Sequence, residues 1–153
     1  MNLIPPHYNP RTTIRYEFWI CLFLVLITLT TYWKVRHFDF TNFDDNLYVY
    51  YNQHIRSGIT PEGVVWSFTF QEKDNNYWHP LTWLSHMLDV ELYGMNPGLH
   101  HLSNVAYHTL NAILLFIALN WMTGAIWRSA FVAILFALHP LNVESVAWIS
   151  ERK

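Results

Sequence analysis

The chain has 153 residues, of which 52% are hydrophobic and only 13% are charged, against ~25% charged residues in soluble domains. Its formal net charge of -2 leaves no basic face, which excludes nucleic-acid binding, and its single cysteine, Cys21, excludes a disulfide framework and a cysteine-based metal site. Apolar runs alternate with long polar stretches, so we predict an all-α membrane protein with a large loop on the aqueous side.

Residues 16–34 are predicted to form the first transmembrane helix, after a cytoplasmic N-terminus over residues 1–15. The run carries no charge between Glu17 and Lys34, and it nearly matches the ~20 residues that a spanning helix needs. Aromatic residues at both ends suit the membrane interfaces: Tyr16, Trp19, Tyr32 and Trp33. A cleaved signal peptide is the alternative, but no small-residue cleavage site follows the run, so we interpret it as a retained span.

Two further spans are predicted at residues 100–122 and 127–149. A short turn over residues 123–126 joins them. Arg128 beside the turn favours a cytoplasmic turn and N-terminus by the positive-inside rule, although the charges that flank the first span nearly balance. Residues 35–99 then form an external loop, periplasmic or lumenal, and residues 150–153 emerge on the same side. Because the chain stops directly after a span, we expect it to be the N-terminal part of a longer protein.

The external loop contains two predicted amphipathic helices. Thr60 is a typical N-cap and precedes Pro61 at the first helical position. His79 and Pro80 open the second helix, and Gly94 ends it. Leucines recur in this helix at three- and four-residue steps and predict an apolar stripe that lies on the membrane or on the spans: Leu81, Leu84, Leu88 and Leu92.

The start of the loop, FDFTNFDDNLY over residues 38–48, places three acids among aromatic residues. Placing an acidic side chain beside a membrane costs free energy unless water solvates it, so an acid at such a position often has a function. Asp44 and Asp45 are adjacent, so in an extended segment their side chains point to opposite faces and only one can face a site. There a carboxylate can act as the base that takes a proton from an acceptor hydroxyl. The alternative is an ordinary interfacial loop whose acids cap a turn.

The second span carries a polar face. His100, Asn104, His108 and Asn111 fall at spacings of four, four and three residues, with His101 alongside. A polar stripe within a span faces the bundle interior or a wet cavity. It either lines a site or joins the helices through hydrogen bonds worth ~0.6 kcal/mol each, and both interpretations stay open.

Polar residues also mark the third span and the end of the chain. His139-Pro140 predicts a kink, and Glu144, one turn later, should face protein or water. Arg152 and Lys153 emerge on the external side, against the positive-inside trend, which favours binding of a lipid-linked phosphate. An ordinary surface cluster is the alternative.

Nine histidines raise the question of a metal. His79 and His86 lie seven residues apart in the loop, with Asp89 three further on, but no HExxH or comparable ligand set is present. We therefore assign no metal site and no cofactor, and a divalent cation is a hypothesis without a motif.

Four stretches, in this order, closely resemble the N-terminal region of TMTC-like proteins: FDFTNFDDNLYVY, ITPEGVVWSFTF, WHPLTWLSHMLDVELYGMNPGLHHLSNVAYH and TGAIWRSAFVAILFALHPLNVESVAWISERK. These are multi-span proteins with C-terminal tetratricopeptide repeats, related to protein O-mannosyltransferases of the GT-C class. The resemblance covers about residues 34–153. It is specific because several unusual sequence motifs occur in the same order and at matching spacing. The family's remaining spans and repeats are absent from this sequence, so we expect transfer activity only from the full-length protein.

The resemblance implies a partial GT-C-like bundle of three transmembrane helices. It also implies a glycosyltransferase that moves a mannose-like sugar from a polyprenyl-phosphate donor to serine or threonine hydroxyls of a protein acceptor. By position, the essential acid of the first external loop falls on Asp44-Asp45. The residues expected to bind substrate or lipid phosphate are His79, His100, His101, Asn104, His108, His139, Glu144, Arg152 and Lys153.

The expected partners are the lipid bilayer, the lipid-linked sugar and the protein acceptor, with no nucleic acid. A bacterial inner membrane is expected in preference to the endoplasmic reticulum. The alternative function, from another class, is a non-catalytic membrane anchor for a downstream tetratricopeptide-repeat domain.

Overall fold

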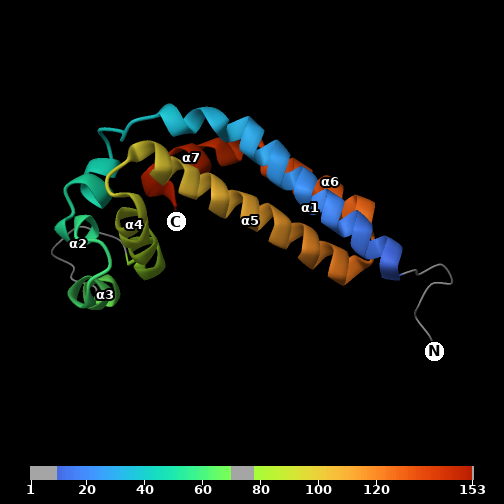
Figure 1. Cartoon of the computed structure of the whole chain (residues 1–153), viewed down its shortest axis with the longest axis horizontal. Helices are drawn as coiled ribbons and strands as arrows, with labels where there is room; N and C mark the ends of the chain where they lie inside the picture. The colour runs from blue at the N-terminus through green and yellow to red at the C-terminus, as the bar shows by residue number, and fades with distance from the viewer. Residues whose placement is uncertain (1–9, 70–77, 153) are drawn as a thin grey trace. The chain divides into compact units, whose positions relative to one another are not determined.

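The computed structural model describes residues 10–69 and 78–152, and Figure 1 shows them as a succession of helices. No strand occurs within these ranges, and the prediction of an all-α membrane protein is confirmed. The chain divides into two compact units, each described by itself below. Of the described residues, the first unit contains 10–31 and 108–139, and the second contains 32–69, 78–107 and 140–152.

The first unit packs most of α1 (Pro10–Tyr32) against the second half of α5 (Pro97–Thr123) and against α6 (Ile126–Leu138). These helices run side by side in Figure 1. Their buried core consists of Ile20, Leu24, Ala112, Phe116, Ala130, Ala133 and Ala137. Small residues on α6 let the helices approach closely, as is typical of helix packing in membranes. Asn120 donates a hydrogen bond to the carboxylate of Glu17 at 2.7 Å, which satisfies the acid at the start of the apolar run.

Two segments are long and apolar enough to cross a membrane: Ile14–His37, which includes most of α1, and Pro97–Thr123, which is α5. Helix α6 and residues 140–147 make a third only if their bent pair counts as one span. The interruption predicted at His139-Pro140 is present: His139 has extended backbone (φ -65, ψ 130), because the residue before a proline avoids the helical region. Whether the two helices cross the membrane as one span stays a prediction.

The second unit is built from short helices around α4 (Pro80–Tyr93). The other elements, in chain order, are η1 (Trp33–His37), η2 (Asn46–Tyr50), α2 (Gln53–Arg56), α3 (Pro61–Phe68), the first part of α5, η4 (Pro140–Asn142), α7 (Val143–Ala147) and η5 (Ile149–Glu151). Its core consists of Tyr48, Val49, Ile55, Trp83, Met87 and Ile149. The rings of Tyr48 and Trp83 stack with their centroids 4.9 Å apart, which joins η2 to α4.

The three predicted helix boundaries in this unit are confirmed, including the start of α4 at Pro80 after His79. The Thr60 hydroxyl accepts the backbone N–H of Gly63 at 3.0 Å, so Thr60 caps α3 and Pro61 occupies its first turn. Gly94 follows the last residue of α4 with φ +62, a conformation that glycine adopts without a Cβ penalty.

Helix α4 buries a different face from its leucines. Leu81, Leu88 and Leu92 are exposed, whereas the buried positions are Trp83, His86, Met87 and Asp89. Leu84 is half-buried against the core of this unit, whereas the other three leucines of the stripe are exposed, and their contact with the bilayer stays a prediction.

Candidate functional site

Arg152, near the C-terminal end, is held in a polar cluster of the second unit. Its Nη2 lies 2.5 Å from Oδ2 of Asp89, and its Nε donates to Oδ1 of Asn104 at 2.6 Å. The same guanidinium donates to Oγ of Ser85 at 3.2 Å and to the carbonyl of His100 at 3.1 Å. Its side chain is only 8% exposed. Arg152 is therefore not part of an exposed surface cluster, and its fork joins α4, α5 and the C-terminal segment.

Asp89 is the acid at the centre of this cluster. Its Oδ1 accepts hydrogen bonds from the Tyr93 hydroxyl at 2.8 Å and the Ser103 hydroxyl at 2.9 Å, and these two hydroxyls also contact each other. Burial by itself raises the pKa of Asp89, but the contact with the His100 ring and the charge of Arg152 outweigh it, so the pKa lies below its ordinary value. Asp89 is therefore a fixed, ionised carboxylate at neutral pH.

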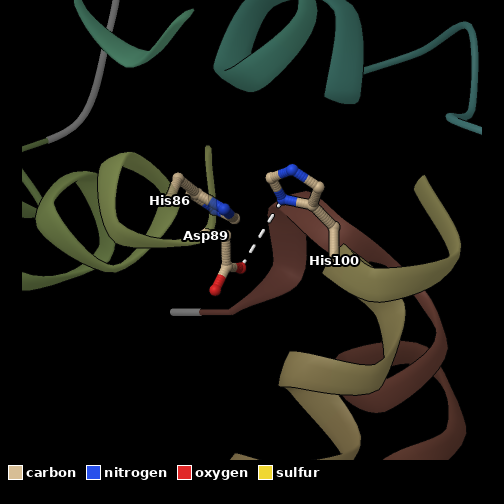
Figure 2. Close-up of side chains that lie close together, drawn as sticks. All are labelled: His86, Asp89 and His100. Carbon is tan, nitrogen blue, oxygen red and sulfur yellow. Dashed lines mark ion pairs between the residues drawn. The ribbon is translucent and has the colours of Figure 1, made fainter. Parts of the chain in front are cut away.

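Two histidines lie beside Asp89, and Figure 2 shows how His86 and Asp89 from α4 meet His100 from α5. Nδ1 of His100 lies 3.5 Å from Oδ2 of Asp89, and Nε2 lies 3.0 Å from the carbonyl of Gly94. His86 is completely buried, and burial, with the nearby charge of Arg152, holds its pKa well below the ordinary value. We call His86, Asp89 and His100 the His–Asp cluster.

Asp45, one of the two predicted catalytic acids, is completely buried. Its Oδ2 accepts the backbone N–H of Thr41 at 2.9 Å, and its Oδ1 accepts the backbone N–H of Ser150 at 3.0 Å. Both carboxylate oxygens therefore accept hydrogen bonds from backbone N–H groups. The side chain closes the turn at the start of the loop and ties it to the C-terminal segment.

Asp44 differs from its neighbour. It is half-buried, and within residues 10–69 and 78–152 its carboxylate makes no hydrogen bond or ion pair. The extended backbone expected for this pair is wrong. Residues 42–44 form a turn that leads into η2, because the backbone carbonyl of Asp44 accepts the N–H groups of Leu47 and Tyr48. Asp44 is thus the acid of the pair that is left open to a ligand.

The predicted polar face of the second span is mostly buried and bonded to protein. Nδ2 of Asn104 donates to the Trp148 carbonyl at 2.8 Å, and Nε2 of His101 lies 3.5 Å from the Asp39 carbonyl. In the first unit, Nε2 of His108 lies 3.0 Å from the Ala137 carbonyl. Asn111 is exposed, so the stripe ends at His108. These contacts favour the interpretation in which the polar side chains join segments of the chain over the one in which they line a water-filled site.

The remaining predicted site residues are spread over both units. His79 is half-buried at the start of α4, and Glu144 is exposed in α7. His139 is exposed at the end of α6, and with His108 it belongs to the first unit. Lys153 lies outside the described residues. The structure therefore brings together His100, Asn104 and Arg152, and it adds partners that the sequence reading did not assign to a site.

Those added partners are Ser85, His86, Asp89, Tyr93 and Ser103. Helical spacing carried part of the signal, since Ser85, Asp89 and Tyr93 recur every four residues on one face of α4. The spacing of residues within α4 could not predict their contact with Arg152, which lies near the C-terminal end of the chain.

Two curated relatives align with this chain over 116 positions, and each alignment covers 71% of the chain. The protein named "Protein O-mannosyl-transferase TMTC1" from Mus musculus is 32% identical, and the protein of the same name from Homo sapiens is 30% identical. The predicted similarity to TMTC-like proteins is confirmed. The chain is a membrane protein related to glycosyltransferases.

The match spans only 12% and 13% of the lengths of these two relatives. No protein-family model matches the chain. No solved structure matches it either. Both relatives come from mammals, so they lend no support to the expected bacterial inner membrane.

Proposed function

We propose that this chain is the N-terminal part of an integral-membrane, GT-C-type glycosyltransferase. The full-length enzyme would transfer a mannose-like sugar from a polyprenyl-phosphate donor to serine or threonine hydroxyls of a protein, on the external side of the membrane. One observation carries the proposal: in a chain similar to protein O-mannosyl-transferases, the acidic pair divides into a buried anchor and an acid open to a ligand.

Asp45 is the anchor of this pair. Its two bonds to backbone N–H groups fix the turn before η2, and its complete burial keeps an acceptor hydroxyl away from the carboxylate. Asp44 follows the same turn with no hydrogen-bond partner for its carboxylate in the described residues. We therefore assign the role of general base to Asp44 and a positioning role to Asp45.

In the proposed reaction, Asp44 takes the proton of the acceptor hydroxyl, and the hydroxyl oxygen forms a bond to the anomeric carbon of the donor sugar. The bond from that carbon to the phosphate oxygen breaks, and the lipid phosphate leaves with the electron pair. Attack from the face opposite the phosphate inverts the anomeric configuration. The lipid chain stays in the bilayer, so the phosphate lies at its surface beside the loop.

The leaving phosphate requires nearby cations. Arg152 and Lys153 are the proposed phosphate ligands. For Arg152 this role means exchanging its longest contacts, those to Ser85 at 3.2 Å and to the His100 carbonyl at 3.1 Å, for phosphate oxygens. The shorter contacts to Asp89 and Asn104 can stay in place and hold the guanidinium.

The test uses Asp44→Asn and Asp45→Asn in the full-length protein, with transfer from a lipid-linked sugar as the measurement. Loss of a general base costs about 10²- to 10⁴-fold in rate, so Asp44→Asn should lose at least ~100-fold while its melting temperature stays within a few degrees of the parent. Asp45→Asn should lower the melting temperature as well as the rate. Transfer at the parent rate by a correctly inserted Asp44→Asn protein contradicts the proposal and supports the membrane-anchor alternative.

A further inference from the structure

One residue of the His–Asp cluster, His86, has ring nitrogens without a hydrogen-bond partner in the described part of the chain. Its side chain is completely buried. A neutral imidazole carries one N–H donor and one lone pair, and native proteins rarely leave both unsatisfied in a buried position. The ring lies beside Asp89 and His100 (Figure 2), so a ligand between the three would satisfy it.

His100 presents a second unsatisfied lone pair. The Gly94 carbonyl can only accept, so Nε2 of His100, at 3.0 Å, carries a hydrogen. In the neutral ring Nδ1 is then a bare lone pair, and it faces the carboxylate Oδ2 of Asp89 at 3.5 Å. Two electron-rich atoms at that distance repel each other. A cation between Nδ1 and Oδ2 would replace this repulsion with two attractive contacts.

We propose that His86, Asp89 and His100 form a binding site for a divalent transition-metal ion, with Zn²⁺ as the ion that suits them best. One ligand atom from each residue lies within 4.8 Å of the others. Ligands about 2.0 Å from a tetrahedral zinc ion lie about 3.3 Å apart, which is close to the 3.5 Å between His100 and Asp89. Two imidazoles with one carboxylate suit zinc, whereas Ca²⁺ and Mg²⁺ prefer oxygen ligands.

Hydrogen bonds around the cluster already orient its ligands. The Gly94 carbonyl fixes the tautomer of His100, and the hydroxyls of Tyr93 and Ser103 hold the Oδ1 atom of Asp89, which leaves Oδ2 toward the cluster. Outer hydrogen bonds of this kind are a regular feature of histidine and carboxylate metal ligands.

Arg152 opposes the metal ion. Its guanidinium is paired with the same Oδ2 atom at 2.5 Å, so metal and arginine compete for one oxygen of Asp89, and their positive charges repel. A bound metal ion therefore loosens the hold of Arg152 on α4. Removal of the arginine charge should strengthen metal binding, a result that no general damage to the fold would produce.

The experiment measures zinc on the purified, detergent-solubilised chain. The protein is stripped with a chelator, titrated with ZnCl₂, and assayed for bound zinc by elemental analysis and for its melting temperature. We expect one zinc ion per chain and a higher melting temperature with zinc. His86→Ala should weaken binding at least ~10-fold. His54→Ala, which removes an exposed histidine of the same unit, should bind like the parent.

Two further measurements keep the result decisive. Because His86 is buried, His86→Gln provides a second variant of similar volume, and the chelator titration of the unaltered chain needs no variant at all. Arg152→Gln should bind zinc more tightly than the parent. No stoichiometric zinc on the parent, or equal binding by the His86 and His54 variants, overturns the proposal. None of these readouts involves sugar transfer, so the result is independent of the proposed function.

Discussion

Asp45 and Ser150 stand 105 positions apart in the sequence and are joined by a hydrogen bond of 3.0 Å from the Ser150 backbone N–H to the buried carboxylate. The other oxygen of Asp45 holds the N–H of Thr41 at 2.9 Å. The acid at the start of the loop thus fastens the C-terminal segment in place. That segment carries Arg152, so Asp45 also helps to place the guanidinium beside Asp89.

Asp45→Ala should therefore destabilise the second unit. It removes two hydrogen bonds to a charged acceptor, each worth about 1.5–3 kcal/mol, and leaves two backbone N–H groups without partners. We expect a loss of about 3 kcal/mol in the free energy of unfolding, measured by denaturant titration in detergent. Asp44→Ala is the matched control and should change the stability by less than ~0.5 kcal/mol. Equal losses in the two variants would contradict the division of roles within the pair.

Arg152 supplies a second test of stability. Arg152→Met leaves the buried carboxylate of Asp89 without its cation, and breaking a buried ion pair costs about 3–5 kcal/mol. Arg56→Met, at an exposed arginine of the same unit, should cost less than ~0.5 kcal/mol. Combining Arg152→Met with Asp89→Asn should cost clearly less than the sum of the two single changes, because the second change removes the stranded charge. Strictly additive losses would show that the two side chains do not interact.

The local sequence predicted the helix boundaries of the second unit well, because the responsible atoms lie within a few residues. Thr60 caps α3 through Gly63, three residues on, and Gly94 ends α4 through its own φ. The proline at position 140 also predicted where α6 is interrupted, because the conformational restriction falls on His139, the residue directly before it.

The polar cluster was only partly predictable. His100, Asn104 and Arg152 stood out because polar residues in or beside spans are costly. Asp89 was considered only beside His79 and His86 as a metal ligand and was assigned to no site, because helical spacing does not report its ion pair with Arg152, 63 positions later in the sequence. The leucines of α4 predicted an apolar stripe but not the buried face of the helix, since apolar periodicity does not distinguish a protein core from a bilayer.

The two faces of α4 should respond differently to truncation. Met87 is completely buried in the core of the second unit, so Met87→Ala should cost about 2–5 kcal/mol in detergent through lost contacts and a residual cavity. Leu81 is 76% exposed, and Leu81→Ala should cost less than ~0.5 kcal/mol. Denaturant titrations of both variants measure the difference. A cost at Leu81 as large as at Met87 would place the leucine stripe in a protein interface.

The predicted sidedness of the membrane is tested by cysteine labelling in a chain whose single cysteine, Cys21, is replaced by alanine. Gly98 is unsuitable for a new cysteine, because a Cβ there would collide with the carbonyl of Arg36. Glu62 in α3 and Thr123 at the end of α5 are both exposed and serve instead. If residues 35–99 are external, a membrane-impermeant maleimide should label Glu62→Cys in intact cells, whereas Thr123→Cys should react only after permeabilisation. The reverse pattern would place Asp44 on the cytoplasmic side, away from an externally presented lipid-linked sugar, and would remove the topological basis of the proposed transfer reaction.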